Sequence, residues 1–246
     1  MSAGHGVGRT AARRLGRALM LVLLCGVSLQ LFWLARIALM VIVDPQSTTY
    51  QRSEIWRLLT DSHQAAWAQQ WMDEGRISPH LKRAVIASED AGFTEHGGVE
   101  WEALELAWSR NQRAQARATP KRPAKLVGSS TITQQLAKNL FLSGERTLAR
   151  KAQELVLCVA LEALLSKRRI LEIYLNHVEF GEGLFGAQAA ARHYFGRDAA
   201  RLDANAAARL AVLLPAPKRL ERQFNSAYVN GRAATIVARM AAVEIP

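Results

Sequence analysis

Residues 128–142 read GSSTITQQLAKNLFL, a stretch whose polar and apolar residues recur with the period of a helix. Glycine and hydroxyl residues open it, as is typical of a helix N-terminus. Gln134 and Lys138 lie four residues apart, whereas Leu136 and Leu140 turn the other way. The pattern therefore predicts a helix with an amide and ammonium face opposite a core face. Free amide groups in its first turn predict an anion site, and an ordinary capped amphipathic helix is the alternative.

Downstream, residues 145–154 read ERTLARKAQE and place more cations on adjacent helical turns. Arg150 and Glu154 have the spacing of a simple helical ion pair, which contributes only about 0.3 to 0.5 kcal/mol. The set of Arg146, Arg150 and Lys151 near Lys138 suits a diphosphate, because arginine offers forked hydrogen bonds and lysine a point charge. We therefore predict a diphosphate site here.

Upstream, residues 88–98 read SEDAGFTEHGG, in which an apolar helix ends at two carboxylates. Glu89 or Asp90 could act as a general base, because the neighbouring apolar residues would raise the pKa of a carboxyl group by desolvation. The alternative is a structural ion pair at the end of the helix. His96 is interpreted as a hydrogen-bonded structural residue, since no nearby histidine or cysteine offers metal-binding spacing.

The rest of the C-terminal part is expected to be helical. Helical apolar spacing marks residues 81–90, a long segment 147–176 and residues 186–195, and no convincing alternating strand is present. Residues 111–125 are polar, basic and contain two prolines, so they are expected to form a mobile loop. Aromatic and polar residues of the stretch 167–196 are interpreted as scaffold that shapes a cleft. These scaffold residues are Tyr174, Asn176, Phe180, Tyr194 and Phe195.

An apolar run covers residues 18–43 and is interrupted by Arg36. A helix needs about 20 apolar residues to cross the hydrocarbon, so the run predicts a retained transmembrane anchor. The alternative, a cleaved signal peptide, has a shorter apolar core and a small-residue cleavage site. Residues 1–17 hold several arginines and no acid, which predicts a cytoplasmic N-terminal tail. Everything after Val43 is then expected on the outer side of the membrane.

Residues 44–78 form a polar juxtamembrane segment that contains Trp67 and Trp71. If this segment is helical, both rings lie on one face and could anchor at the membrane interface; packing of the rings onto the following domain is the alternative. Residues 79–246 have the length of one domain.

The chain carries 32 lysines and arginines against 21 acids, a formal charge of +11, but the excess is local. Every acid lies from Asp44 onward, and residues 110–125 hold six basic residues without an acid. This distribution excludes a uniformly basic nucleic-acid-binding surface, and we expect no nucleic-acid partner. The basic segment is instead expected to meet anionic lipid headgroups or to steer a charged lipid. Its basic residues are Arg110, Arg113, Arg117, Lys121, Arg122 and Lys125.

Five motifs occur in the order and type of the peptidoglycan glycosyltransferase family, which this chain resembles over roughly residues 80–217. They read EDAGFTEHGG, GSSTITQQLAKN, RKAQE, KRRILEIYLN and EFGEGLFGAQAAARHYFG. The resemblance implies a mainly α, lysozyme-like fold with a head and a membrane-proximal jaw behind one N-terminal transmembrane helix. Residues 79–246 would form the glycosyltransferase domain, facing the periplasm from a single-pass anchor in the bacterial inner membrane. The family usually has Gly-Gly where this chain has Gly128 and Ser129, and Asp where it has Glu100.

The resemblance implies a hexosyltransferase that polymerises lipid II into glycan strands by inverting transfer and releases undecaprenyl diphosphate, without transpeptidase activity. Glu89 would be the general base on the acceptor 4-hydroxyl. Glu154 would help to hold the donor diphosphate, directly or through a divalent cation, Mg²⁺ or Mn²⁺; no cofactor is otherwise expected. Basic residues would neutralise the leaving group, namely Lys138, Arg146, Arg150 and Lys151. Further substrate-binding residues would be Asp90, Ser130, Thr131, Gln134 and Gln135.

The expected partners are lipid II, the growing glycan strand, an anionic membrane and other proteins of cell-wall synthesis or division. Two alternatives stay open. A lysozyme-like muramidase or lytic transglycosylase would share a helical fold and a catalytic glutamate but would not need the cations between Lys138 and Lys151. A membrane-anchored scaffold without catalysis would have no reason to keep both Glu89 and Glu154 in a cationic cleft.

Overall fold

The computed structural model describes residues 5–61, 66–117, 119, 128, 130–142, 144–145 and 147–246, with side chains from residue 13 onward. The chain divides into two compact units, Met1–Val43 and Asp44–Pro246. The first unit consists largely of helix α1 (His5–Leu39). Within α1, the segment Arg13–Leu39 reaches a mean hydropathy of 2.2 and is long and apolar enough to cross a membrane. The predicted N-terminal apolar helix is thus present.

The second unit is mainly helical, which confirms the predicted fold class. Its first helices are α2 (Thr49–Asp61), α3 (Pro79–Glu89), α4 (Trp101–Ala116), α5 (Ile132–Phe141) and α6 (Leu148–Leu164). The later ones are α7 (Lys167–His177), α8 (Ala187–Phe195), α9 (Ala204–Leu213), α10 (Pro217–Leu220) and α11 (Ala227–Met240). Short 3₁₀ turns are η1 (Glu74–Arg76), η2 (Ala199–Arg201) and η3 (Glu221–Gln223).

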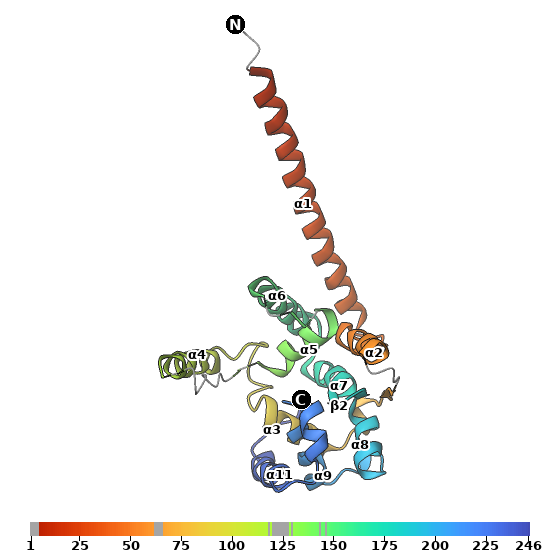
Figure 1. The fold of residues 1–246 in the computed structure, drawn as a ribbon. Coiled ribbons are helices and arrows are strands. Elements are labelled where there is room, and N and C mark those ends of the chain that lie inside the picture. Colours follow the sequence, from red (N-terminus) through yellow and green to blue (C-terminus); the bar gives the residue numbers. More distant parts are fainter. Residues whose placement is uncertain are drawn as a thin grey trace. The chain divides into compact units, whose positions relative to one another are not determined.

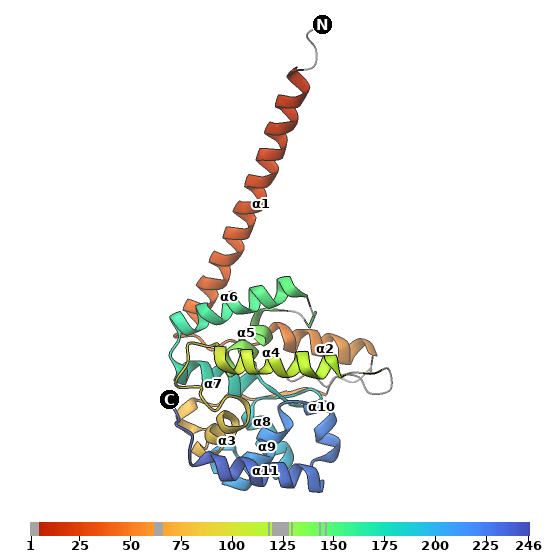
Figure 2. The same cartoon turned by 90° about the vertical axis from the view of Figure 1, so that its left-hand side faces the viewer.

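Two groups of helices form the layers of this unit. Helices α3, α9 and α11 pack on one another in one group, and α5 packs against α2, α6 and α7 in the other (Figure 1). Helix α4 stands apart from the second group in Figure 1 and crosses in front of α5 and α2 in Figure 2. The largest fully buried side chains include Phe93, Tyr174 and Phe180. Helix α5, the segment on which the sequence interpretation begins, therefore lies between elements that are far apart along the chain.

A small sheet was not predicted. Its order is β1 (Ala68–Gln69), β3 (Leu184–Phe185), β2 (Glu179–Gly181), with β1 parallel and β2 antiparallel to β3. Strands of two or three residues are too short to show an alternating pattern, which explains why the sequence did not reveal them.

The prediction of one long helix over residues 147–176 is wrong, because the segment forms two helices, α6 and α7. Leu165 is extended, with ψ at 145°, and the Ser166 side chain accepts a hydrogen bond from the backbone amide of Arg169. Serine is a strong N-cap, so it starts a new helix inside an apolar pattern that continues across the break. The two halves can then contribute different faces to the site.

The loop expected over residues 111–125 begins later than predicted, since α4 continues to Ala116. Glutamine, arginine and alanine are good helix formers, and they prolong the helix although the segment is polar. Residues 118 and 120–127, which include Lys121, Arg122 and Lys125, lie outside the described residues.

Trp67 and Trp71 do not lie on one helix. The Trp67 ring packs on Phe185 at a centroid distance of 4.6 Å, and Trp71 meets His177 edge to face at 5.8 Å. Both rings therefore pack onto the domain, which favours that alternative over anchoring at the membrane interface.

Candidate active site

Helix α3 delivers Glu89 to the site. The Ser78 side chain caps the helix by accepting from the amide of His80, and Pro79 stands at its first position. The buried residues Leu81, Val85 and Ile86 fasten the helix to the core. Its last residue is Glu89, so the carboxylate stands where the helix gives way to a turn.

Asp90 ties that turn to the start of α5. Its Oδ1 lies 2.7 Å from His96 Nε2, and its Oδ2 accepts from the backbone amide of Ile132 at 2.9 Å. His96 Nδ1 in turn accepts from the amide of Gly98 at 3.0 Å, which leaves the proton of a neutral ring on Nε2. The structural interpretation of His96 is confirmed. Because both oxygens of the buried Asp90 have partners, it holds the site together from within.

The anion site expected at the N-terminus of α5 is already occupied by the chain itself. Asp90 accepts from the amide of Ile132, and Thr131 Oγ1 accepts from the amide of Gln134 in a capping box. The prediction of free amide groups in this first turn is therefore wrong at these two positions. Thr131 Oγ1 also donates to Gly98 O at 2.6 Å, so both of these hydrogen bonds of the Thr131 side chain are structural.

Gly98 is the point at which this turn meets α6. Its φ is +86°, and a Cβ built there would lie 2.7 Å from Cys158 Sγ and 2.8 Å from Glu162 Cγ. A side chain at this position would combine backbone strain with overpacking.

We expect Gly98→Ala to lower the free energy of unfolding by about 2 kcal/mol or more, from left-handed strain and the close contact with α6. Gly97→Ala is the matched control, since a Cβ there meets nothing within 4 Å. Thermal melting of the detergent-solubilised protein measures both changes. Equal melting temperatures for the two variants would contradict the role assigned to Gly98.

Glu89 sits in an environment suited to a base. Gln135 Nε2 donates to Glu89 Oε2 at 2.9 Å, and Ser88 Oγ lies 3.4 Å from Glu89 Oε1. Burial raises the pKa of the Glu89 carboxyl group, the charge of Asp90 raises it further, and the bonds from Gln135 and Ser88 oppose the shift. A raised pKa makes the carboxylate a better proton acceptor near neutral pH.

Gln135, which donates to Glu89, also lines a polar pocket of about 370 Å³. Six more of the predicted site residues line this pocket together with Gln135. They are Ser130, Gln134, Lys138, Arg150, Lys151 and Glu154. The remaining lining residues are Tyr50, Asn139, Leu142, Gly144 and Glu145. Arg146 lies outside the described residues.

Glu154 organises two of the cations. Arg150 Nη1 donates to its Oε2 at 2.6 Å, and Lys151 Nζ pairs with its Oε1. Arg150 Nε remains buried without a hydrogen-bond partner in the part of the chain that the structure describes. A buried donor without a partner is costly, and an anion bound in this cationic pocket would satisfy it.

Lys138 is held differently. Among the described residues no carboxylate pairs with its ammonium group. Withdrawal from water and the neighbouring charges of Arg150 and Lys151 lower its pKa, against the opposing charge of Glu154. Its charge is thus available to a ligand in the pocket.

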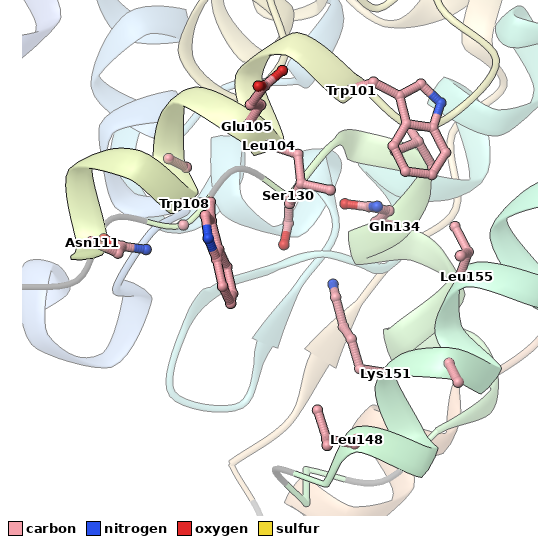
Figure 3. A pocket seen from close by; sticks show the side chains of 14 residues that line it. Trp101, Leu104, Glu105, Trp108, Asn111, Ser130, Gln134, Leu148, Lys151 and Leu155 are labelled. Carbon is pink, nitrogen blue, oxygen red and sulfur yellow. The ribbon is translucent and has the colours of Figure 1, made fainter.

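An apolar groove of about 810 Å³ continues from the polar pocket and was not predicted. Figure 3 shows Trp101, Leu104 and Trp108 of α4 facing Leu148 and Leu155 of α6. The two tryptophans are 65% and 66% exposed, so the groove is open. Their spacing with Leu104 marks one helical face, and this signal was present in the sequence. The polar pocket and the groove share residues at their junction, namely Ser130, Gln134 and Lys151.

Comparison with known proteins identifies the family of the chain. Residues 57–241 match the model of the transglycosylase family. The chain is 50% identical to the biosynthetic peptidoglycan transglycosylase of Bordetella pertussis, over 93% of each chain. It is 49% identical to the protein of that name from Bordetella avium, over 97% of this chain and 98% of the relative. The relative from Burkholderia pseudomallei is 46% identical over 97% and 93%.

Proposed function

The chain belongs to the transglycosylase family, and from this premise we propose that it polymerises lipid II into glycan strands by inverting transfer. One observation carries the proposal. Helix α5 holds the general base through Gln135 and, three residues on, presents Lys138 to the cationic pocket. Proton acceptor and leaving-group site therefore lie within about one helical turn of each other.

In this reaction the 4-hydroxyl oxygen of the acceptor N-acetylglucosamine attacks the anomeric carbon of the growing strand. The bond from that carbon to the diphosphate oxygen breaks, and undecaprenyl diphosphate leaves with the electron pair. Glu89 takes the proton of the attacking hydroxyl, for which its raised pKa suits it. Attack opposite the leaving group in a single displacement inverts the anomeric centre.

The diphosphate gains negative charge as the bond breaks, and the cationic pocket stabilises that charge. Lys138 supplies an ammonium group that no carboxylate in the described residues neutralises. Arg150 offers its unpaired Nε, and Arg146 is assigned to the same role from its motif. Ser130 and Gln134 line the pocket where it meets the apolar groove.

Glu154 acts through its neighbours, because its two oxygens orient Arg150 and Lys151 toward the pocket. Both carboxylate oxygens already face cationic side chains, and the described residues hold no group of three histidine, cysteine or acidic side chains that could bind a metal ion. We therefore derive no step through a divalent cation.

The apolar groove explains how a lipid-linked substrate reaches a polar reaction centre. Tryptophan and leucine side chains of α4 and α6 offer an open apolar path, and it meets the diphosphate pocket at Lys151. We assign this path to the polyprenyl chain of the donor. A diphosphate bound at Lys151 could then continue directly into a lipid chain lying in the groove.

The anchor completes the proposal. Helix α1 would hold the protein in the bacterial inner membrane as a single-pass protein. The arginines of the N-terminal tail, with no acid before Asp44, favour a cytoplasmic N-terminus and a periplasmic catalytic unit. The lipid substrate and the enzyme then share one membrane.

The test is to incubate labelled lipid II with the full-length protein in detergent and to separate the products by size. Long chains that a muramidase digests are the expected result. Shortening of preformed glycan without polymer would assign the chain to the lytic enzymes. Binding of lipid II without any turnover would favour a scaffold.

A further inference from the structure

Tyr174 of α7 is a buried residue whose hydroxyl group reaches the active site. Its side chain belongs to the core, with 1% of its surface exposed. The hydroxyl donates to Gln135 Oε1 at 3.0 Å, across a sequence separation of 39 residues. The mechanism above makes no use of this contact, and the motif analysis treated Tyr174 as scaffold.

Gln135 connects this hydroxyl to the base. Its Oε1 accepts from Tyr174, and its Nε2 donates to Glu89 Oε2 at 2.9 Å. A side-chain amide has one acceptor end and one donor end, so a donor at the first end determines which end faces Glu89. Tyr174 is a dependable donor, because burial and the charges of Glu89 and Asp90 hold its pKa well above the ordinary value.

We propose that Tyr174 is a positioning residue for the general base: through Gln135 it keeps an N–H group directed at Glu89 and so holds the carboxylate in its ionised, oriented form. The proposal rests on the proposed function for its catalytic consequence. It also reassigns Gln135, which lines the pocket, from substrate binding to the orientation of Glu89.

Loss of the hydroxyl has a defined effect. Without it, the amide of Gln135 can turn its Oε1 toward Glu89, and two acceptors then face each other unless the carboxyl group is protonated. Among the described residues, the charged and titratable groups around Glu89 are Asp90 and Tyr174. Asp90 is hydrogen-bonded to His96 and to the N-terminus of α5. None of them replaces the lost N–H donor.

Tyr174→Phe is therefore expected to move the acidic limb of the pH profile of kcat/KM upward by about one pH unit. Below this limb the variant loses about tenfold in kcat/KM, and the loss shrinks as the pH rises and Glu89 ionises. The sign follows from the carboxylate being the active form. A merely structural role would lower the melting temperature without moving the limb.

The experiment compares wild type with Tyr174→Phe, Gln135→Leu and the double variant, using the full-length protein and labelled lipid II. Gln135→Leu removes the same connection from the pocket side, so it serves even if the core variant folds poorly. The limb should move upward in all three, and Tyr174→Phe should add nothing to Gln135→Leu. Tyr194→Phe is the control, because it removes a partly buried hydroxyl that donates to Phe180 O, outside this chain of contacts.

A ¹³C titration of the carboxyl group of Glu89 measures the same upward shift of its pKa without turnover. The Glu89→Gln variant identifies the signal that belongs to Glu89. If wild type makes no polymer, the proposed function fails, and the titration still decides whether Tyr174 controls the ionisation of Glu89. A wild-type midpoint in Tyr174→Phe, or independent effects in the double variant, would overturn the positioning role.

Discussion

Glutamine in place of Glu89 is expected to lower the rate of lipid II polymerisation about 10²- to 10⁴-fold, the contribution of a positioned general base. The substitution keeps the shape of the side chain, and its carbonyl oxygen can still accept the hydrogen bond that Gln135 donates. It removes the basic oxygen that takes the proton of the acceptor hydroxyl in the proposed mechanism. Initial rates with labelled lipid II at saturating concentration measure the loss.

Two controls separate this chemical effect from misfolding. Glu95→Gln changes an exposed carboxylate in the same turn and should leave the rate unchanged. Burial raises the pKa of Glu89 in the folded protein, so ionisation of this group opposes folding above its unfolded pKa. Glu89→Gln should therefore keep or raise the melting temperature. A rate above about a tenth of wild type would show that Glu89 is not the base.

Methionine in place of Lys138 is expected to lower kcat about 10²- to 10³-fold, the usual loss when one stabilising group of a developing anion is removed. Arg150 and Lys151 are held by Glu154, whereas Lys138 keeps an ammonium group without a carboxylate partner among the described residues. In the proposed mechanism its charge therefore acts on the diphosphate as the bond to the anomeric carbon breaks. We expect kcat to fall more than KM rises, because the diphosphate gains its additional negative charge only as the bond breaks.

Arg232→Met is the matched control, since it removes an exposed cation of α11. Its kcat should equal that of wild type, which would show that overall charge is not responsible. Lys138→Arg tests geometry, because a planar fork replaces a point charge at the same net charge. A Lys138→Met variant with an altered KM and an unchanged kcat would assign Lys138 to ground-state binding alone.

Local signals in the sequence indicated several of the helices and the residue types of the site. The opening of α5 by hydroxyl residues, the end of α3 near Glu89 and the face that carries Gln134 and Lys138 all follow from neighbours within one or two helical turns. The break at Ser166 was missed, because an apolar pattern that continues in phase conceals a cap between two helices.

The sequence by itself determined that α1 is apolar and long enough to cross a membrane, that the second unit is helical, and which acidic, amide and basic residues are available for chemistry. These properties depend on composition and on spacings of three or four residues. Only the tertiary structure decided which partner each polar atom meets. Asp90 accepts a hydrogen bond from the first turn of α5 at a sequence separation of 42 residues, and Tyr174 donates one to Gln135 at a separation of 39. Contacts between residues so far apart in sequence form when buried polar groups find partners as the helices pack, and no local pattern encodes them.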